Sequence, residues 1–131
     1  MKGSKILLID DDNDDVEILA DAFTRSGVDS VHYVHTVMDA FIYLQALPLN
    51  ELPKLVITDL YLPGITGLEF LADLKTMEKY KQIHVIVLST VKSNAEIERY
   101  KQMGAIDYVK KPSSYEEYLE VAQNIKSRLL A

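Results

Sequence analysis

The sequence predicts an α/β fold in which helices cover both faces of a five-stranded parallel sheet, a doubly wound arrangement. Five short apolar runs rich in β-branched residues recur along the chain, at residues 6–9, 31–34, 55–58, 84–88 and 106–109. A stretch with apolar residues at helical spacing follows each run. Such strict alternation requires right-handed crossovers between parallel strands, so we expect one sheet with the order 2-1-3-4-5.

Local signals place the ends of the helices. Gly27 and Gly104 stand where the first and fourth helices should end, and Pro48 stops the second. Thr36 suits the start of the second helix. The last three helices each show a capping box, in the pairs Thr66 with Glu69, Ser93 with Glu96, and Ser114 with Glu117.

Length and composition limit the number of domains, the kinds of partner and the cellular location that we expect. The 131 residues suit one domain of ordinary size, and we expect a single domain over residues 1–131 with no output domain. The net charge of -6 argues against a nucleic-acid partner, which needs clustered Lys and Arg. Cysteine is absent, and the first apolar run is too short for a signal peptide or a membrane span. We therefore expect a cytoplasmic protein.

Carboxylates directly follow two of the predicted strands. Asp10 and Asp11 come after the first strand, and Asp59 comes after the third, just before a break at Pro63 and Gly64. These two strands are neighbours in the expected order, so the three acids should converge on one crevice at the carboxyl edge of the sheet. Clustered carboxylates repel one another unless a cation neutralises them. The pattern therefore predicts a site for a hard divalent ion, Mg²⁺ or Mn²⁺.

The expected ligand set follows from what such an ion prefers. Magnesium takes oxygen ligands in octahedral geometry and keeps several waters. We expect Asp11 and Asp59 to bind it directly, Asp10 to bind through water, and the main-chain carbonyl of Tyr61 to supply another oxygen. Asp59 would keep a second oxygen free to attack phosphorus, which makes it a candidate phosphate acceptor.

Two further polar residues should approach the same crevice. Ser89 follows the fourth strand and Lys111 follows the fifth. A phosphoryl group in transfer spreads negative charge over its equatorial oxygens, which the ammonium and the hydroxyl would stabilise. Pro112 fixes the turn after Lys111, and a cis peptide between them would aim the ammonium inward.

Each residue also has a plainer interpretation. Asp59 can be a turn or cap residue, Lys111 a solvated surface lysine, and Ser89 a hydroxyl that caps its own loop. The other acids after the first strand suit a loop and a helix N-terminus; they are Asp12, Asp14 and Asp15. The convergence of the whole set at one sheet edge favours phosphoryl chemistry.

These residues resemble the receiver domain of two-component response regulators, the CheY-like family with a flavodoxin-like fold. The resemblance runs from Lys5 to about Leu129 and rests on five matches in chain order, at Asp10-Asp11, Asp59, Ser89, Tyr108 and Lys111-Pro112. The order 2-1-3-4-5 is the order of that family and is therefore not independent of the resemblance.

The resemblance implies a signalling phosphoacceptor rather than an enzyme with a separate substrate. Asp59 would receive its phosphoryl group from a phosphohistidine on a sensor histidine kinase or a phosphotransfer protein, and the chain would catalyse only this step and a slow autodephosphorylation. Asp10 and Asp11 would be the magnesium acids, and Ser89 and Lys111 the phosphate sensors.

The resemblance also implies a route for the output. Movement of Ser89 would let Tyr108, an aromatic switch, turn inward and alter the surface of the fourth helix, fifth strand and fifth helix. A protein partner or a second copy would bind there.

The acidic run and the Ser89-Thr90 pair are most similar to short stand-alone receivers, including those that partner bacterial phytochromes. Tyr61 is bulkier than many residues at its position and should slow the loss of phosphate by limiting water.

Other functions fit less well. An aspartate-nucleophile phosphatase needs a second acid where Tyr61 stands. A flavin-binding domain needs a phosphate loop after the first strand, where five acids would repel the phosphate, and no Gly-x-Gly-x-x-Gly or Gly-Lys-Ser stretch is present. A receiver-like interaction module that does not depend on phosphorylation stays open. We assign no role to His32, His35 or His84.

Overall fold

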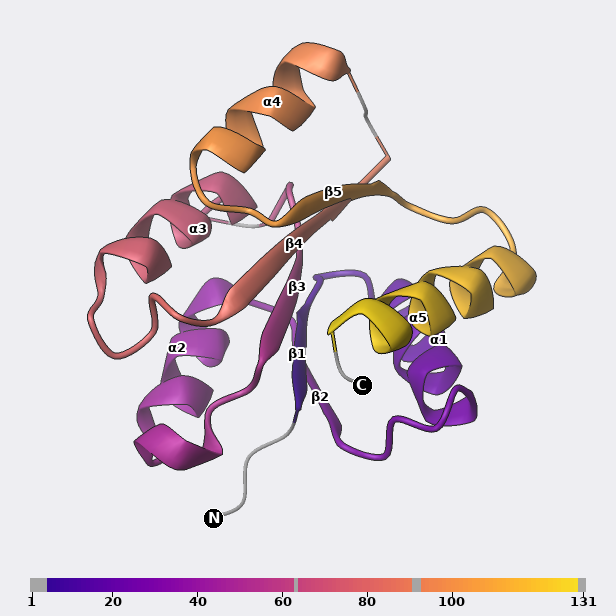
Figure 1. The fold of residues 1–131 in the computed structure, drawn as a ribbon, viewed down its shortest axis with the longest axis horizontal. Coiled ribbons are helices and arrows are strands. Elements are labelled where there is room, and N and C mark those ends of the chain that lie inside the picture. The colour runs from indigo at the N-terminus through magenta and orange to yellow at the C-terminus, as the bar shows by residue number, and fades with distance from the viewer. Residues whose placement is uncertain (1–4, 63, 91–92, 130–131) are drawn as a thin grey trace.

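Strands and helices alternate along the chain (Figure 1). The computed structural model describes residues 5–62, 64–90 and 93–129, so Pro63 lies outside the described residues. The strands are β1 Ile6–Ile9, β2 Val31–Val34, β3 Leu55–Asp59, β4 His84–Ser89 and β5 Asp107–Lys110. The helices are α1 Asn13–Arg25, α2 Val37–Gln45, α3 Gly67–Thr76, α4 Asn94–Gln102 and α5 Tyr115–Leu129, with a short 3-10 helix, η1 Leu49–Glu51, after α2. Among the described residues, none of the helices combines the length and apolar character needed to span a membrane.

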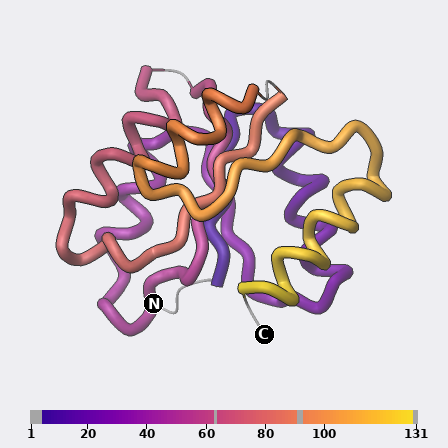
Figure 2. The backbone as a smooth tube through the Cα atoms, turned by 45° about the horizontal axis from the view of Figure 1, so that its top comes forward, coloured from indigo at the N-terminus to yellow at the C-terminus, as the bar shows by residue number. Residues whose placement is uncertain are grey.

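The sheet confirms the predicted topology. All four strand pairings are parallel and the order is β2-β1-β3-β4-β5. Helices α1 and α5 cover one face of the sheet, and α2, α3 and α4 cover the other (Figure 1, Figure 2). The register pairs Ile9 of β1 with Thr58 of β3, so the residues that follow them, Asp10 and Asp59, leave the sheet side by side.

The central strands supply two separate cores. On β3, Val56 belongs to the core under α2, α3 and α4, whereas Leu55 and Ile57 belong to the core under α1 and α5. Strands β1 and β4 divide their side chains in the same alternating way. Parallel strands buried on both faces need apolar residues at every position, which explains the continuous apolar runs in the sequence.

Strand β2 is the half-exposed edge of the sheet, and its histidines make specific contacts. The His32 ring stacks on Tyr43 of α2 with centroids 4.0 Å apart and an interplanar angle of 8°. His35, just after β2, places Nδ1 3.0 Å from the main-chain oxygen of Asp10. These contacts accommodate both polar rings, His32 within β2 and His35 just after it.

The helix caps largely follow the predicted pattern. At four helices, the hydroxyl of the expected cap residue accepts a hydrogen bond from the main-chain N–H three residues later. These cap residues are Thr36, Thr66, Ser93 and Ser114. The last capping box differs in its return bond, because the carboxylate of Glu117 accepts from the N–H of Ser113 at 2.9 Å rather than from that of Ser114. Helix α1 has its own cap, since Asp12 accepts from the N–H of Asp15.

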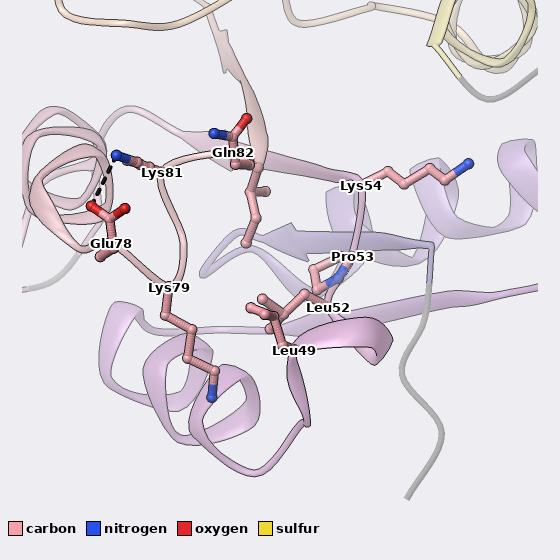
Figure 3. Close-up of a pocket in the computed structure, with 9 residues that line it drawn as sticks. Leu49, Leu52, Pro53, Lys54, Glu78, Lys79, Lys81 and Gln82 are labelled. Atoms are coloured by element: carbon pink, nitrogen blue, oxygen red, sulfur yellow. Dashed lines mark ion pairs between the residues drawn. The ribbon is translucent and has the colours of Figure 1, made fainter.

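The amino edge of the sheet carries an open pocket of about 440 Å³ between η1 and the loop from α3 to β4 (Figure 3). Leu49 lines it on one side. At its rim, Glu78 and Lys81 form an ion pair at 2.9 Å, and Lys79 donates to the main-chain oxygen of Leu47 at 3.1 Å. This pocket lies at the edge opposite to the clustered acids.

A glycine allows α3 to begin directly against the end of β3. The N–H of Gly67 donates to the carbonyl of Leu60 at 2.8 Å. A Cβ at residue 67 would overlap the main-chain oxygen of Asp59 and lie 3.1 Å from Cα of Leu60. Only a residue without a side chain can hold the helix this close, so Gly67 helps to fix the position of Asp59.

We expect Gly67→Ala to lower the free energy of unfolding by about 1–3 kcal/mol, because backbone must shift to admit the methyl group. Urea unfolding measures this loss. Asn94→Ala, at the exposed first position of α4, is the matched control and should change stability by less than about 0.5 kcal/mol. Equal effects at the two positions would contradict the close packing.

Candidate functional site

Main-chain contacts fix the two strand ends that carry the acids. The N–H of Asp10 donates to the carbonyl of Val34 at 3.2 Å, and the Asp10 carboxylate accepts from the N–H of Asp12 at 3.0 Å. The buried hydroxyl of Thr58 donates to the main-chain oxygen of Asp59 at 2.9 Å. The two carboxylates are therefore held at one edge of the sheet by the strands themselves.

Three carboxylates form a group that can hold a metal ion. One oxygen from each of Asp10, Asp11 and Asp59 lies within 4.8 Å of the others. Asp10 is buried, Asp59 half-buried and Asp11 exposed, so the group opens to solvent on one side. An all-oxygen, negatively charged set with room for water suits Mg²⁺ or Mn²⁺. The residues present fit such an ion, and the Tyr61 carbonyl as a further ligand stays a prediction.

The ammonium of Lys111 lies among the acids. Its Nζ is 3.0 Å from Oδ2 of Asp10, 3.0 Å from Oδ2 of Asp15 and 3.3 Å from Oδ2 of Asp59. The Lys111 side chain is only 11% exposed. This arrangement contradicts the plainer interpretation of Lys111 as a solvated surface lysine.

Burial and neighbouring charges together shift the pKa values of groups in and near the crevice. Burial lowers the pKa of Lys111, but the hydrogen bonds that its ammonium donates to Asp15 and Asp10 and the charges of Asp10 and Asp59 outweigh that effect, so the pKa is raised. Burial raises the pKa of Asp10, and the Asp12 N–H and the Lys111 ammonium offset only part of that effect. On α5, burial and the charge of Asp15 raise the pKa of Tyr118 to about 12. Lys111 is therefore a permanent cation at neutral pH.

Ser89 and Tyr108 are both buried beside the crevice. Ser89 ends β4, and its main-chain oxygen accepts from the N–H of Lys111 at 2.8 Å. Burial and the nearby Glu96 carboxylate of α4 raise the pKa of Tyr108, and the Ser89 hydroxyl partly offsets them. The Tyr108 ring stacks on Tyr100 of α4, with centroids 5.2 Å apart and an interplanar angle of 6°. A continuous chain of contacts thus leads from the end of β4 to α4.

Two expectations are wrong. The peptide bond before Pro112 is trans, because the described residues contain no cis peptide. The ion pairs of Lys111 and its N–H bond to Ser89 direct the ammonium inward without a cis bond. The Tyr108 ring is only 2% exposed, so it already lies inward and has no inward turn left to make.

Sequence reasoning missed two residues of the site. Asp15 was assigned to the loop and helix N-terminus, yet it shares Lys111 with the predicted acceptor. It stands with Asp12 and Asp14 at the start of α1, and no local pattern distinguished it from them. Gly67 carried no signal, because only the packing of α3 against Asp59 explains it.

The comparison with known families agrees with this geometry. The model of the response regulator receiver domain matches residues 6–123. The chain belongs to the response regulator receiver family. Receiver domains are the phosphoaccepting signalling domains of two-component systems; they bind a divalent metal and interact with histidine kinases or phosphotransfer proteins.

This receiver has relatives with different roles. It is 32% identical over 126 residues to the probable methanogenesis regulatory protein FilR2 of Methanothrix harundinacea. The aligned residues make up 92% of this chain and 80% of FilR2. It is 30% identical over 108 residues to the chemotaxis protein CheY homolog of Campylobacter jejuni, with coverage of 82% and 81%. The family is thus shared, whereas the process served differs between relatives.

Solved structures confirm the expected likeness to phytochrome-partner receivers. The phosphorylated cyanobacterial phytochrome response regulator RcpA matches with a TM-score of 0.85 at 28% identity, over 98% of this chain and 95% of that one. The Mn²⁺-bound form of response regulator Rcp1 matches with a TM-score of 0.80 at 26% identity, over 95% and 93%.

Proposed function

We propose that this receiver takes a phosphoryl group onto Asp59 from a phosphohistidine of a histidine kinase or phosphotransfer protein, with Mg²⁺ or Mn²⁺ as cofactor. The observation that carries the proposal is the position of Lys111 Nζ, 3.3 Å from Oδ2 of Asp59, beside two further acids. The likeness to RcpA, a phosphorylated regulator, and to Rcp1, a Mn²⁺-bound one, supports both parts.

The chemistry requires little beyond positioning and positive charge. A carboxylate oxygen of Asp59 forms a bond to phosphorus while the bond from phosphorus to the histidine nitrogen breaks, and the imidazole keeps the electron pair. Lys111 stabilises the negative charge on the phosphoryl oxygens, and Ser89 donates its hydroxyl to one of them. Asp10, Asp11 and Asp59 would hold a divalent ion, which would supply further positive charge there. Water later hydrolyses the acyl phosphate.

The output passes through the contacts that join β4 to α4. The phosphoryl group carries roughly 1.5 to 2 negative charges and three acceptor oxygens, and it replaces the single charge of the Asp59 carboxylate beside Ser89. When the Ser89 hydroxyl turns to these oxygens, the surroundings of the nearby Tyr108 change, and the stack of Tyr108 on Tyr100 transmits the change to α4. We propose that the face of α4, β5 and α5 then binds a protein partner or a second copy. The chain would act in the cytoplasm as a single receiver domain.

Incubation with Mg²⁺ and acetyl phosphate, followed by intact mass measurement, tests the acceptor. We expect one labile phosphoryl group on the wild-type protein and none on Asp59→Asn, which lacks the nucleophile. Asp73→Asn, an exposed acid on α3, should be modified like the wild type. A protein that gains no phosphoryl group would instead be the phosphorylation-independent interaction module.

Tyr61 is expected to prolong the phosphorylated state. Its side chain is 58% exposed, stands two residues after Asp59 and lines a small pocket with Leu60 and Tyr100. From there we expect it to hinder a water that approaches the acyl phosphate. Tyr61→Ala should speed the loss of phosphate by at least about twofold. The control is Ile42→Ala, a side chain of similar exposure on α2. An unchanged half-life in the Tyr61 variant would disprove this role.

A further inference from the structure

Asp15 contacts the same ammonium as the phosphate acceptor. Its Oδ2 lies 3.0 Å from Nζ of Lys111, whereas Oδ2 of Asp59 lies 3.3 Å away. The Asp15 side chain is 33% exposed and that of Lys111 is 11% exposed, so the pair is partly screened from water. The N–H of Asp15 donates to Oδ1 of Asp12 at 3.1 Å, and this bond holds the first turn of α1 in place. The ion pair therefore has a fixed backbone on the Asp15 side.

The three partners of Lys111 differ in what phosphorylation does to them. An ammonium has three protons to donate, and the carboxylates of Asp10, Asp15 and Asp59 can take all three. Asp59 becomes an acyl phosphate, and Asp10 belongs to the group that holds the metal. Asp15 has neither role, so phosphorylation leaves its carboxylate chemically unchanged.

We propose that Asp15 is a positioning residue that competes with the phosphoryl group for Lys111. This inference rests on the function proposed above. A phosphoryl group on Asp59 attracts the ammonium toward its oxygens, and any movement in that direction weakens the ion pair with Asp15. The pair is therefore stronger in the unphosphorylated protein, and a contact that favours one state shifts the balance toward it. Asp15 thus biases the receiver toward the unphosphorylated state.

Titration with beryllofluoride, a phosphoryl mimic, in the presence of Mg²⁺ and followed by amide NMR, tests the competition. Asp15→Asn keeps the shape of the side chain and removes its charge, and we expect it to bind beryllofluoride about two- to fivefold more tightly than the wild type, as loss of one partly exposed ion pair implies. Asp15→Glu restores the charge and should bind like the wild type. Asp14→Asn removes an exposed charge from the same helical turn and should also bind like the wild type.

The outcomes separate this inference from the proposed function. Unchanged or weaker binding by Asp15→Asn would overturn the competition, as would equal tightening by Asp14→Asn or no rescue by Asp15→Glu. Thermal unfolding of each variant shows that it is folded. Failure of the proposed function would appear differently, as a wild-type protein that neither binds beryllofluoride nor gains a phosphoryl group on Asp59.

Discussion

One ammonium in a group of carboxylates is the interaction on which this receiver depends. Lys111 contacts Asp10, Asp15 and Asp59 at once, and Asp11 adds a fourth acid at the open side. A single positive charge cannot balance four negative ones. The crevice is therefore suited to a further cation, which would relieve an imbalance that the fold itself creates. With that cation in place, the positive charge needed to hold a phosphoryl group would be present beside Asp59.

The fold maintains that imbalance by fixing the main chain rather than the side chains. Strands β1 and β3 are neighbours with their main-chain atoms in register, so Asp10 and Asp59 cannot move apart without breaking the centre of the sheet. Two cores, one on each face, hold these strands. Gly67 lets α3 close against the end of β3. In the proposed mechanism, the resulting stiffness would let a rearrangement at Ser89 be transmitted to Tyr108 and α4 instead of being absorbed locally.

Sequence patterns were sufficient to predict the features of the fold and site that depend on local chemistry. Continuous apolar runs indicated strands buried on both faces, and cap hydroxyls such as Thr66 and Ser93 marked helix starts. The pairing of the first and third strands then brought Asp10 and Asp59 together. The strand order itself came with the family resemblance, because alternation alone leaves more than one doubly wound order possible.

The features that sequence could not supply depend on contacts between distant segments. Asp15 and Lys111 are 96 residues apart, and nothing in the acidic run indicated which acid would face the lysine. The buried position of the Tyr108 ring depends on its stack against Tyr100 of α4. Gly67 matters only because α3 lies against Asp59. Each of these is a tertiary effect with no local signature.

The most direct test of the charge imbalance is the effect of Mg²⁺ on stability in urea. The account predicts that Mg²⁺ raises the free energy of unfolding of the wild-type protein, by about 2.7 kcal/mol at a concentration one hundred times the dissociation constant, because the ion binds only the folded crevice. The Asp11→Asn variant should show a much smaller increase at the same concentration. A wild-type protein whose stability does not respond to Mg²⁺, or an Asp11→Asn variant that responds equally, would contradict it.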